Sequence, residues 1–573
     1  MPRLTLLTKS VWFHRPCYKI LKASFKPSAK PTDEVLLNFA EATNPLYEPE
    51  DTAESDTASV WEGLFSCYTK YILETTFRQE LFKKLPSELQ AIILDFIGPC
   101  WYLILLGETR RLIAQLRNGS ENEFEQPNSG QEIYISRTDY QGHSYISRIN
   151  HIPLGSGLRR IRLPARTKKI VLSIDRIGVR GVQFLDRDSD PLPDGSPWYQ
   201  VLEVSDHHAE AHVSCDGLFV RCIWLVPESP FRKRRIWSSP NPPKFQPRNV
   251  HHTRNSCRLH YVKLGAEVQG LVVCCFDAKI LGIYGFSGMS KAFKTFTSLM
   301  NRRPICRQKY WFFFPINPGE FIEAAWIRKL KSIRGTCYNP ILVVSPKSPL
   351  LSLHNSPIEI RTTLGRTITF GPHSPAHMQH LYKFRSLVKD GDGVVSGIFH
   401  DGLDPKAWCV SEVGVTCEHQ GRTSVLDSGP TFDHYSAPPT SLREGSPETS
   451  WYMTKASLEG LLRVRVCRDK RESHHPCCGL LLYYQDRRIE SLGQIRWDQG
   501  LSHELLAPIH IEISNFDGKN YVKDIYGATA DGGLKLGIGG LQLPERGTIV
   551  WWFGRLGDRI DIYNGTACLM SLY

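Results

Sequence analysis

Short apolar runs with a period of two residues fill the chain from residue 131 onward, and they restrict it to a fold built mainly of β-sheet. Five such runs precede residue 186: 133–135, 143–149, 158–163, 170–174 and 179–185. Gly, Pro and Asp separate them, as turns between strands require. The 44 glycines and 37 prolines supply many such turns, and 573 residues are too many for a single core. We therefore expect a multi-domain, mainly β protein.

One segment, residues 85–117, has a helical period instead. Its apolar residues recur at three- and four-residue spacing: Leu85, Leu89, Ile92, Ile93 and Phe96. Pro86 suits the first turn of a helix, and Gly98-Pro99 ends it before a second apolar run begins at Trp101. Helices this short expose more apolar surface than they bury, so we expect them to pack on another structure. That structure is either the rest of this chain, with the segment as a helical cap, or a partner protein.

The start of this segment resembles an F-box, in which an LPxEL leader is followed by an I-L-x-x-[LI] run. The matching residues are Leu85, Pro86, Glu88, Leu89, Ile93, Leu94 and Ile97. The resemblance implies that the helices bind a Skp-type linker of a cullin-RING ubiquitin ligase, while the rest of the chain holds a protein substrate. It assigns partner binding to Leu85, Pro86, Leu89, Ile93 and Ile97. The family usually carries a Cys-x-x-Trp-Arg-like cluster in its third helix, where this chain has residues 107–111, GETRR.

Composition predicts the domain boundaries. We expect a disordered tail at 1–56, basic and then acidic, the helical segment at 57–117, and β-rich domains at 131–227, 261–417 and 451–573. A basic, proline-rich linker at 228–260 and a Ser/Pro/Gly-rich linker at 422–450 separate the β-rich domains. Nine Lys and Arg residues and no acid lie between Ser229 and Ala266, a composition shared by exposed loops and nucleic-acid patches. Because aromatic residues for base stacking are few there, we expect a linker and no nucleic-acid binding.

The middle domain resembles a jacalin-related lectin, which implies β-sheets arranged as a β-prism. Five segments match family landmarks in the family's order: 279–285, 318–322, 361–372, 395–400 and 410–415. In that family a carboxylate just before the last strand accepts hydrogen bonds from sugar hydroxyls. Ser411 occupies the corresponding position, and Asp401 and Asp404 lie close in sequence. Because a serine accepts more weakly than a carboxylate, we expect little binding of simple sugars and a protein-recognition role for this domain.

Other candidate chemistry is sparse. Neither a nucleophile elbow, a P-loop, an H-E-x-x-H pair nor a kinase signature occurs, so we expect no enzyme activity and no cofactor. His474-His475-Pro476-Cys477-Cys478 has metal-binding residue types, but neighbouring side chains of a strand point to opposite faces. The alternating acids of FLDRDSDPLPDG at 184–195 lack the glycine and glutamate of a calcium loop, and a turn explains them better. We therefore expect no metal site.

Compartment and membrane association follow from two further observations. Residues 91–107 hold one charge, but the run is broken at Gly98-Pro99 and is shorter than the roughly 20 residues that span a bilayer, so we expect no membrane segment. The 16 cysteines form no evident disulfide framework, which favours a cytoplasmic or nuclear protein. Residues 1–32 are basic and free of acids like a mitochondrial transit peptide, yet four prolines interrupt any amphipathic helix.

The favoured hypothesis is a non-enzymatic adaptor with an F-box-like helical segment followed by β-sandwich and β-prism-like domains that recognise a protein substrate. The alternative is an intracellular carbohydrate-binding protein, with the helical segment serving only as a cap. The order of these parts also resembles that of proteins from filamentous fungi.

Overall fold

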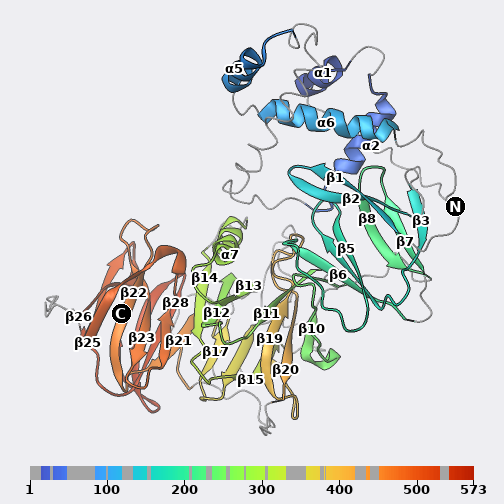
Figure 1. The fold of residues 1–573 in the computed structure, drawn as a ribbon. Coiled ribbons are helices and arrows are strands. Elements are labelled where there is room, and N and C mark those ends of the chain that lie inside the picture. The colour runs from blue at the N-terminus through green and yellow to red at the C-terminus, as the bar shows by residue number, and fades with distance from the viewer. Residues whose placement is uncertain are drawn as a thin grey trace, which may run out of the picture. The chain divides into compact units, whose positions relative to one another are not determined.

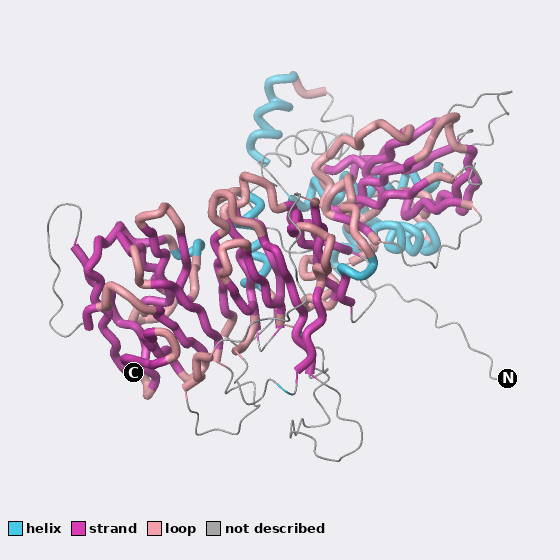
Figure 2. The backbone as a smooth tube through the Cα atoms, turned by 90° about the horizontal axis from the view of Figure 1, so that it is seen from below, coloured by secondary structure: helices cyan, strands magenta, loops and turns pink. Residues whose placement is uncertain are grey.

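The computed structural model describes residues 15–25, 30–47, 84–97, 101–118, 133–150, 157–205, 210–226, 235–252, 258–276, 279–303, 308–330, 357–373, 380, 382–419, 434–438, 451–528 and 541–572. Strands dominate these residues, and most of the helices come early in the chain (Figures 1 and 2). The mainly β fold predicted from the period-two runs is therefore confirmed. The chain divides into two compact units, Met1–Pro242 (unit 1) and Pro243–Tyr573 (unit 2). Within the described ranges, no helix is long and apolar enough to cross a membrane.

Unit 1 begins with helices. They are α1 (Arg15–Ala23), α2 (Asp33–Thr43), α5 (Ser87–Ile97) and α6 (Trp101–Asn118). The Thr32 hydroxyl caps α2 by accepting a hydrogen bond from a backbone amide of its first turn at 3.3 Å. Leu21 of α1 and Leu36 of α2 are buried with Ile113 of α6, so the three helices share an apolar core. The prediction of a disordered tail over residues 1–56 is therefore wrong for α1 and α2, because α6, remote in sequence, covers their apolar side chains.

The rest of unit 1 is antiparallel sheet. β1 (Tyr134–Tyr140) and β2 (His143–Asn150) form a hairpin, and β3 (Gly157–Arg162), β7 (Glu210–Cys215) and β8 (Val220–Leu225) pair in that order. β9 (Ile236–Trp237), β6 (Trp198–Glu203), β4 (Lys169–Ile174) and β5 (Val179–Leu185) also pair in that order. These strands enclose an aliphatic core that includes Ile146, Ile170 and Ile223. Leu112 of α6 packs in a cluster with Tyr145 of β2, which joins the helices to the sheets.

Unit 2 opens with three antiparallel sheets. The first has the order β10 (Val250–His252), β20 (Glu412–Glu418), β19 (Val394–His400) and β11 (Arg258–Lys263). The second is β13 (Lys279–Phe286), β12 (Gly270–Phe276) and β14 (Tyr310–Pro315), and the third is β17 (Thr367–Phe370), β16 (Ile358–Thr362), β15 (Ile322–Leu330) and β18 (Tyr382–Ser386).

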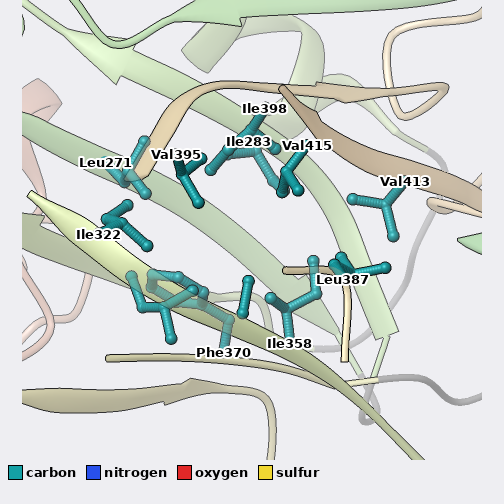
Figure 3. Close-up of a pocket in the computed structure, with 12 residues that line it drawn as sticks. Leu271, Ile283, Ile322, Ile358, Phe370, Leu387, Val395, Ile398, Val413 and Val415 are labelled. Carbon is teal, nitrogen blue, oxygen red and sulfur yellow. The ribbon is translucent and has the colours of Figure 1, made fainter. Parts of the chain in front are cut away.

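Side chains from all three sheets meet in one apolar interior, where a small pocket lies (Figure 3). All of its lining residues are apolar, among them Leu271, Ile322, Phe370, Val395 and Val413. Without a polar group in its lining, the pocket has nothing to orient a ligand. It is therefore packing space within the core rather than a binding site.

Helix α7 (Lys291–Arg302) packs on the sheet that contains β13. Its buried residues Phe293, Phe296 and Met300 join Leu281 of that strand in one cluster. The helix approaches closely at Gly282, where a Cβ atom would lie only 3.0 Å from the Met300 sulfur. A side chain at position 282 would therefore require the Met300 or Phe296 side chain to shift by a few tenths of an ångström.

The C-terminal part of unit 2 is one sheet of ten strands. Its strands are β21 (Tyr452–Ser457), β22 (Leu461–Arg468), β23 (Cys477–Tyr484), β24 (Ile489–Gly493), β25 (Leu501–Phe516), β26 (Lys519–Ala528), β27 (Leu541–Gln542), β28 (Thr548–Gly554), β29 (Gly557–Asn564) and β30 (Ala567–Leu572). The path is β21-β28-β29-β26-β23-β22-β25-β27, with β24 paired to β23 and β30 to β29. A short 3₁₀ turn, η5 (Trp497–Gln499), precedes β25.

The predicted domains at 261–417 and 451–573 share one hydrophobic core. Tyr310 and Tyr452, one from each predicted domain, have ring centroids 4.1 Å apart. The Asn317 Oδ1 atom accepts a hydrogen bond from the Ile489 amide at 2.7 Å, so polar contacts join the two parts as well. They therefore fold as one compact unit, a result that the linker-like composition between them did not indicate.

The predicted linker at 228–260 also differs from the structure. It contains β9, a 3₁₀ turn η2 (Pro247–Asn249) and β10, and Asn249 and Val250 are buried. The Asn249 amide donates a hydrogen bond to Asp392 Oδ2 at 2.8 Å, and Arg248 forms an ion pair with the same carboxylate. The basic character of this stretch is thus partly compensated by an acid far away in the sequence, which composition alone did not reveal. In the second predicted linker, 422–450, only residues 434–438 are described.

Candidate functional site

The first turns of α5 present an apolar face to solvent. Leu89 and Ile92 have exposed fractions of 45% and 55%, while Leu85 and Ile93 are half-buried. The start of the helix is set by Gln90, whose backbone amide donates to Pro86 O at 3.0 Å and whose side chain donates to Leu85 O at 2.9 Å. The helical period therefore exposes two large aliphatic side chains one turn apart.

Four of the five residues predicted to bind a partner lie together at this end of α5. They are Leu85, Pro86, Leu89 and Ile93, and Pro86 is exposed. Ile97 is the last residue of α5, but its side chain lies outside the described part of the chain. Ile92 was recognised only as part of the apolar repeat, and it is the most exposed aliphatic residue described in the helix. Its position between Leu89 and Ile93 in the repeat is the sequence signal that identifies it.

Helix α6 is tied to the β1–β2 hairpin by side chains in and near residues 107–111. Glu108 Oε1 accepts a hydrogen bond from the Gln141 amide at 2.6 Å, and the Arg111 guanidinium donates to Asp139 O. One helical turn farther on, Gln115 Nε2 donates to a threonine hydroxyl of β1 at 2.6 Å. Burial raises the pKa of Glu108. Residues 107–111 thus contribute contacts inside unit 1.

Arg221 of β8 attaches helix α2 to the sheets of unit 1. Its guanidinium donates to the carbonyls of Glu41, at 3.1 Å, and Ala42 at the C-terminal end of that helix. The same side chain pairs with Asp216 and donates to Ile177 O. A cation at the C-terminal end of a helix also interacts favourably with the helix dipole. The helices of unit 1 are therefore held on its sheets by polar as well as apolar contacts.

The predicted carbohydrate-binding residues lie in the loop between β19 and β20, where Asp401 and Ser411 meet. The Asp401 carboxylate accepts hydrogen bonds from the Ser411 amide at 2.8 Å, the Glu412 amide at 3.0 Å and the Ser411 hydroxyl. Asp401 is fully buried, and this burial raises its pKa. Its acceptor capacity is thus used within the loop.

Asp404 has a separate environment in the same loop. It is buried, accepts a hydrogen bond from the Lys406 amide at 3.0 Å and lies 3.6 Å from the buried Arg258 guanidinium. Neither predicted carboxylate is therefore presented to solvent, as recognition of sugar hydroxyls would require. The structure gives no support to the carbohydrate-binding alternative at these residues.

His400 and Arg303 form hydrogen bonds with the backbone of the same loop. The Gly402 amide donates to His400 Nδ1 at 2.9 Å, so His400 Nε2 carries the proton and donates to Ile283 O at 2.8 Å. Burial lowers the pKa of His400 to about 3, and the imidazole is neutral at physiological pH. Arg303 donates to Trp408 O at 2.7 Å and to Gly402 O.

The histidine-cysteine run at 474–478 takes part in packing, and the acidic segment at 184–195 forms a turn. His474 stacks on Phe516 with ring centroids 4.3 Å apart, and Cys477 and Cys478 belong to different apolar clusters. In the acidic turn, Asp186 accepts a hydrogen bond from the Ser189 amide at 2.9 Å. Among the residues that the structure describes, no group of three or more His, Cys, Asp or Glu side chains is placed to hold a metal ion.

Comparison with known proteins does not assign the chain to a family. No protein-family model matches it, and no curated protein sequence matches it significantly. The function must therefore be argued from the sites themselves, of which the exposed face of α5 has the clearest capacity to bind a partner.

Proposed function

We propose that this chain is a non-enzymatic adaptor, in which α5 binds a Skp-type linker of a cullin-RING ubiquitin ligase and the β-rich units recognise a protein substrate. The observation that carries the proposal is the exposure of Leu89 and Ile92 on a helix with an LPxEL leader. Exposed aliphatic side chains one turn apart are the anchors by which an amphipathic helix enters an apolar groove. The F-box resemblance supplies the identity of the partner.

The energetics of this face suit a specific protein contact. Full burial of a leucine or isoleucine side chain contributes about 1.5–3 kcal/mol, and Leu89 and Ile92 are each about half exposed. Their burial in a groove would therefore contribute on the order of 1 kcal/mol each, before any gain from Leu85 and Ile93. Such a contribution makes each side chain measurable by substitution.

The attachment of α6 supports an adaptor role. Only residues 98–100 separate α5 from α6, and α6 is fixed to the β1–β2 hairpin by Glu108, Arg111 and Gln115. A partner on α5 would thus be joined to the β-sheets through a packed helix rather than a long linker. An adaptor needs such a connection to hold a substrate near a ligase.

Binding of the full chain to a purified Skp-type linker protein, measured by titration calorimetry, tests the proposal. We expect Leu89→Ala and Ile92→Ala to weaken binding about fivefold each, and the double variant at least about tenfold. Leu192→Ala is the matched control, because Leu192 is a more exposed leucine on a loop of the same unit. Absence of binding by the wild type, or equal effects of the α5 variants and the control, would overturn the proposal.

A further inference from the structure

Cys467 and Cys478 are neighbours on adjacent strands of unit 2. Cys467 of β22 pairs with Gly479 of β23, and the register shifts so that the next pair is Arg468 with Cys477. Cys478 is therefore the extra residue of a β-bulge beside Cys467. Its thiol donates to Cys467 O at 3.5 Å, and both cysteines are free.

The side chains of Cys467 and Cys478 lie on the same side of the sheet, and that of Cys477 lies on the other side. Cys467 and Cys478 contact the same apolar cluster, whereas Cys477 belongs to the larger core. Cys478 is partly exposed, whereas Cys467 beside it is buried.

The two thiols of this pair differ in their surroundings. Cys467 Sγ accepts a hydrogen bond from the Arg496 amide at 3.2 Å, and the Arg496 guanidinium is held nearby by Asp498 at 2.8 Å. The pKa of Cys467 is lowered, chiefly by a hydrogen bond with the Cys478 side chain, and the pKa of Cys478 is raised, chiefly by the same bond. Cys467 is therefore the more acidic of the two thiols.

We propose that Cys467 and Cys478 form an oxidation site that hydrogen peroxide converts to a disulfide. The Cys467 thiolate attacks one peroxide oxygen, the O–O bond breaks, and the departing hydroxide takes a proton to become water. Cys467 is then a sulfenic acid. The Cys478 sulfur displaces its hydroxyl group, the S–S bond forms, and the hydroxyl leaves with the thiol proton as a second water. Two thiols are oxidised by two electrons, and one peroxide is reduced to two waters.

Three other cysteines serve as internal comparisons. Burial raises the pKa of Cys274 and of Cys477 to about 12 and raises that of Cys275 as well. Cys274 and Cys275 are adjacent in sequence and buried, so proximity alone does not distinguish the proposed pair. The distinguishing feature is the donor environment of Cys467.

The test treats the reduced, full-length chain with hydrogen peroxide, blocks remaining thiols by alkylation and maps the cysteines by tandem mass spectrometry. We expect a Cys467–Cys478 cross-link that forms at least about tenfold faster than oxidation of Cys274 or Cys275. Cys477→Ser is the matched control and should retain the cross-link, whereas Cys478→Ser should abolish it. In Cys478→Ser, dimedone should label Cys467 as a sulfenic acid.

Each alternative result decides against the site. The proposal would be overturned by a Cys477–Cys478 bond, or by a disulfide between Cys467 and another cysteine in Cys478→Ser. It would also be overturned if Cys274 were oxidised as fast as Cys467. Circular dichroism of the reduced variants checks that they are folded. If Cys478→Ser does not fold, dimedone labelling of wild-type Cys467 at short times replaces it, and absence of the label would also count against the proposal.

Discussion

The Asp401 carboxylate accepts hydrogen bonds from both the backbone amide of Ser411, at 2.8 Å, and the Ser411 hydroxyl. Asp401 follows β19 and Ser411 precedes β20, so this contact closes the loop that joins two neighbouring strands. Ser411, which the sequence suggested as a sugar-binding position, is here a donor to an internal carboxylate. These hydrogen bonds therefore connect the two ends of the loop.

Asp401→Asn is expected to destabilise unit 2. The Ser411 and Glu412 amides share Oδ1 of Asp401, whereas the Ser411 hydroxyl donates to Oδ2. Asparagine has only one acceptor oxygen, so when that oxygen serves the two amides the Ser411 hydroxyl loses its acceptor. We expect the free energy of unfolding to fall by about 1–3 kcal/mol, measured by urea denaturation. Asp188→Asn, at an exposed turn, is the control and should change it by less than about 0.5 kcal/mol. Equal effects of the two variants would contradict the structural role of Asp401.

Simple sugars are expected not to bind. The Asp401 and Asp404 carboxylates are buried, and a neutral hydrogen bond from Ser411 contributes only about 1 kcal/mol in water. A glycan array probed with the full chain should therefore give no signal that free mono- or disaccharides displace. A displaceable signal that is lost on substitution within residues 395–415 would restore the carbohydrate-binding alternative.

The histidine pair His260 and His400 is expected to make unit 2 sensitive to acid. The two residues pair across β11 and β19, and their rings meet edge to face with centroids 5.6 Å apart. Burial lowers the pKa of His260 to about 4 and that of His400 to about 3. The unfolded chain takes up these protons near pH 6.5, so stability is lost as pH falls from there toward 4. At pH 5 the loss should reach about 2 kcal/mol per histidine. Urea denaturation at pH 7 and pH 5 measures it, and His260→Gln should reduce the difference; an unchanged difference would contradict the prediction.

Asp558 of β29 is expected to make unit 2 less stable as pH rises, which is the opposite of the effect of the two histidines. Burial raises its pKa to about 7, so the folded chain keeps a proton that the unfolded chain loses near pH 4. Because the folded state binds more protons, stability falls as pH rises from about 4 to about 7. Asp558→Asn should remove this dependence and raise the free energy of unfolding at pH 8 by about 1–3 kcal/mol. Parallel pH profiles for wild type and variant would show that Asp558 does not titrate in this window.

Glu108 is expected to control the attachment of α6. Glu108→Ala leaves the Gln141 amide without its acceptor and should lower the stability of unit 1 by about 1–2 kcal/mol. Hydrogen exchange at the Gln141 amide should become faster in this variant, whereas Glu108→Gln, which keeps an acceptor oxygen, should restore protection. Unaltered exchange in Glu108→Ala would mean that other contacts hold the hairpin.

The sequence pattern alone was sufficient to predict strands and helices whose geometry is set within a few residues. The run predicted at 179–185 is strand β5 with the same ends, and the run at 143–149 is β2 to within one residue. The repeat that starts at Leu85 predicted the helix α5, and only the structure shows that Leu89 and Ile92 are its exposed members. Strand and helix periods arise from backbone geometry within a few residues, so the sequence by itself carries this information.

Contacts between remote segments were decided only by the tertiary structure. α1 and α2 are stable because Ile113 of α6 covers their apolar side chains, and Asn249 is buried because Asp392 and Leu387 receive its hydrogen bonds. The pairing of Asp401 with Ser411 likewise depends on two strands lying side by side. The sequence by itself determined the mainly β character and the helix α5. Folding decided which acids and histidines are buried, because burial and its effect on pKa depend on residues that come from distant parts of the chain.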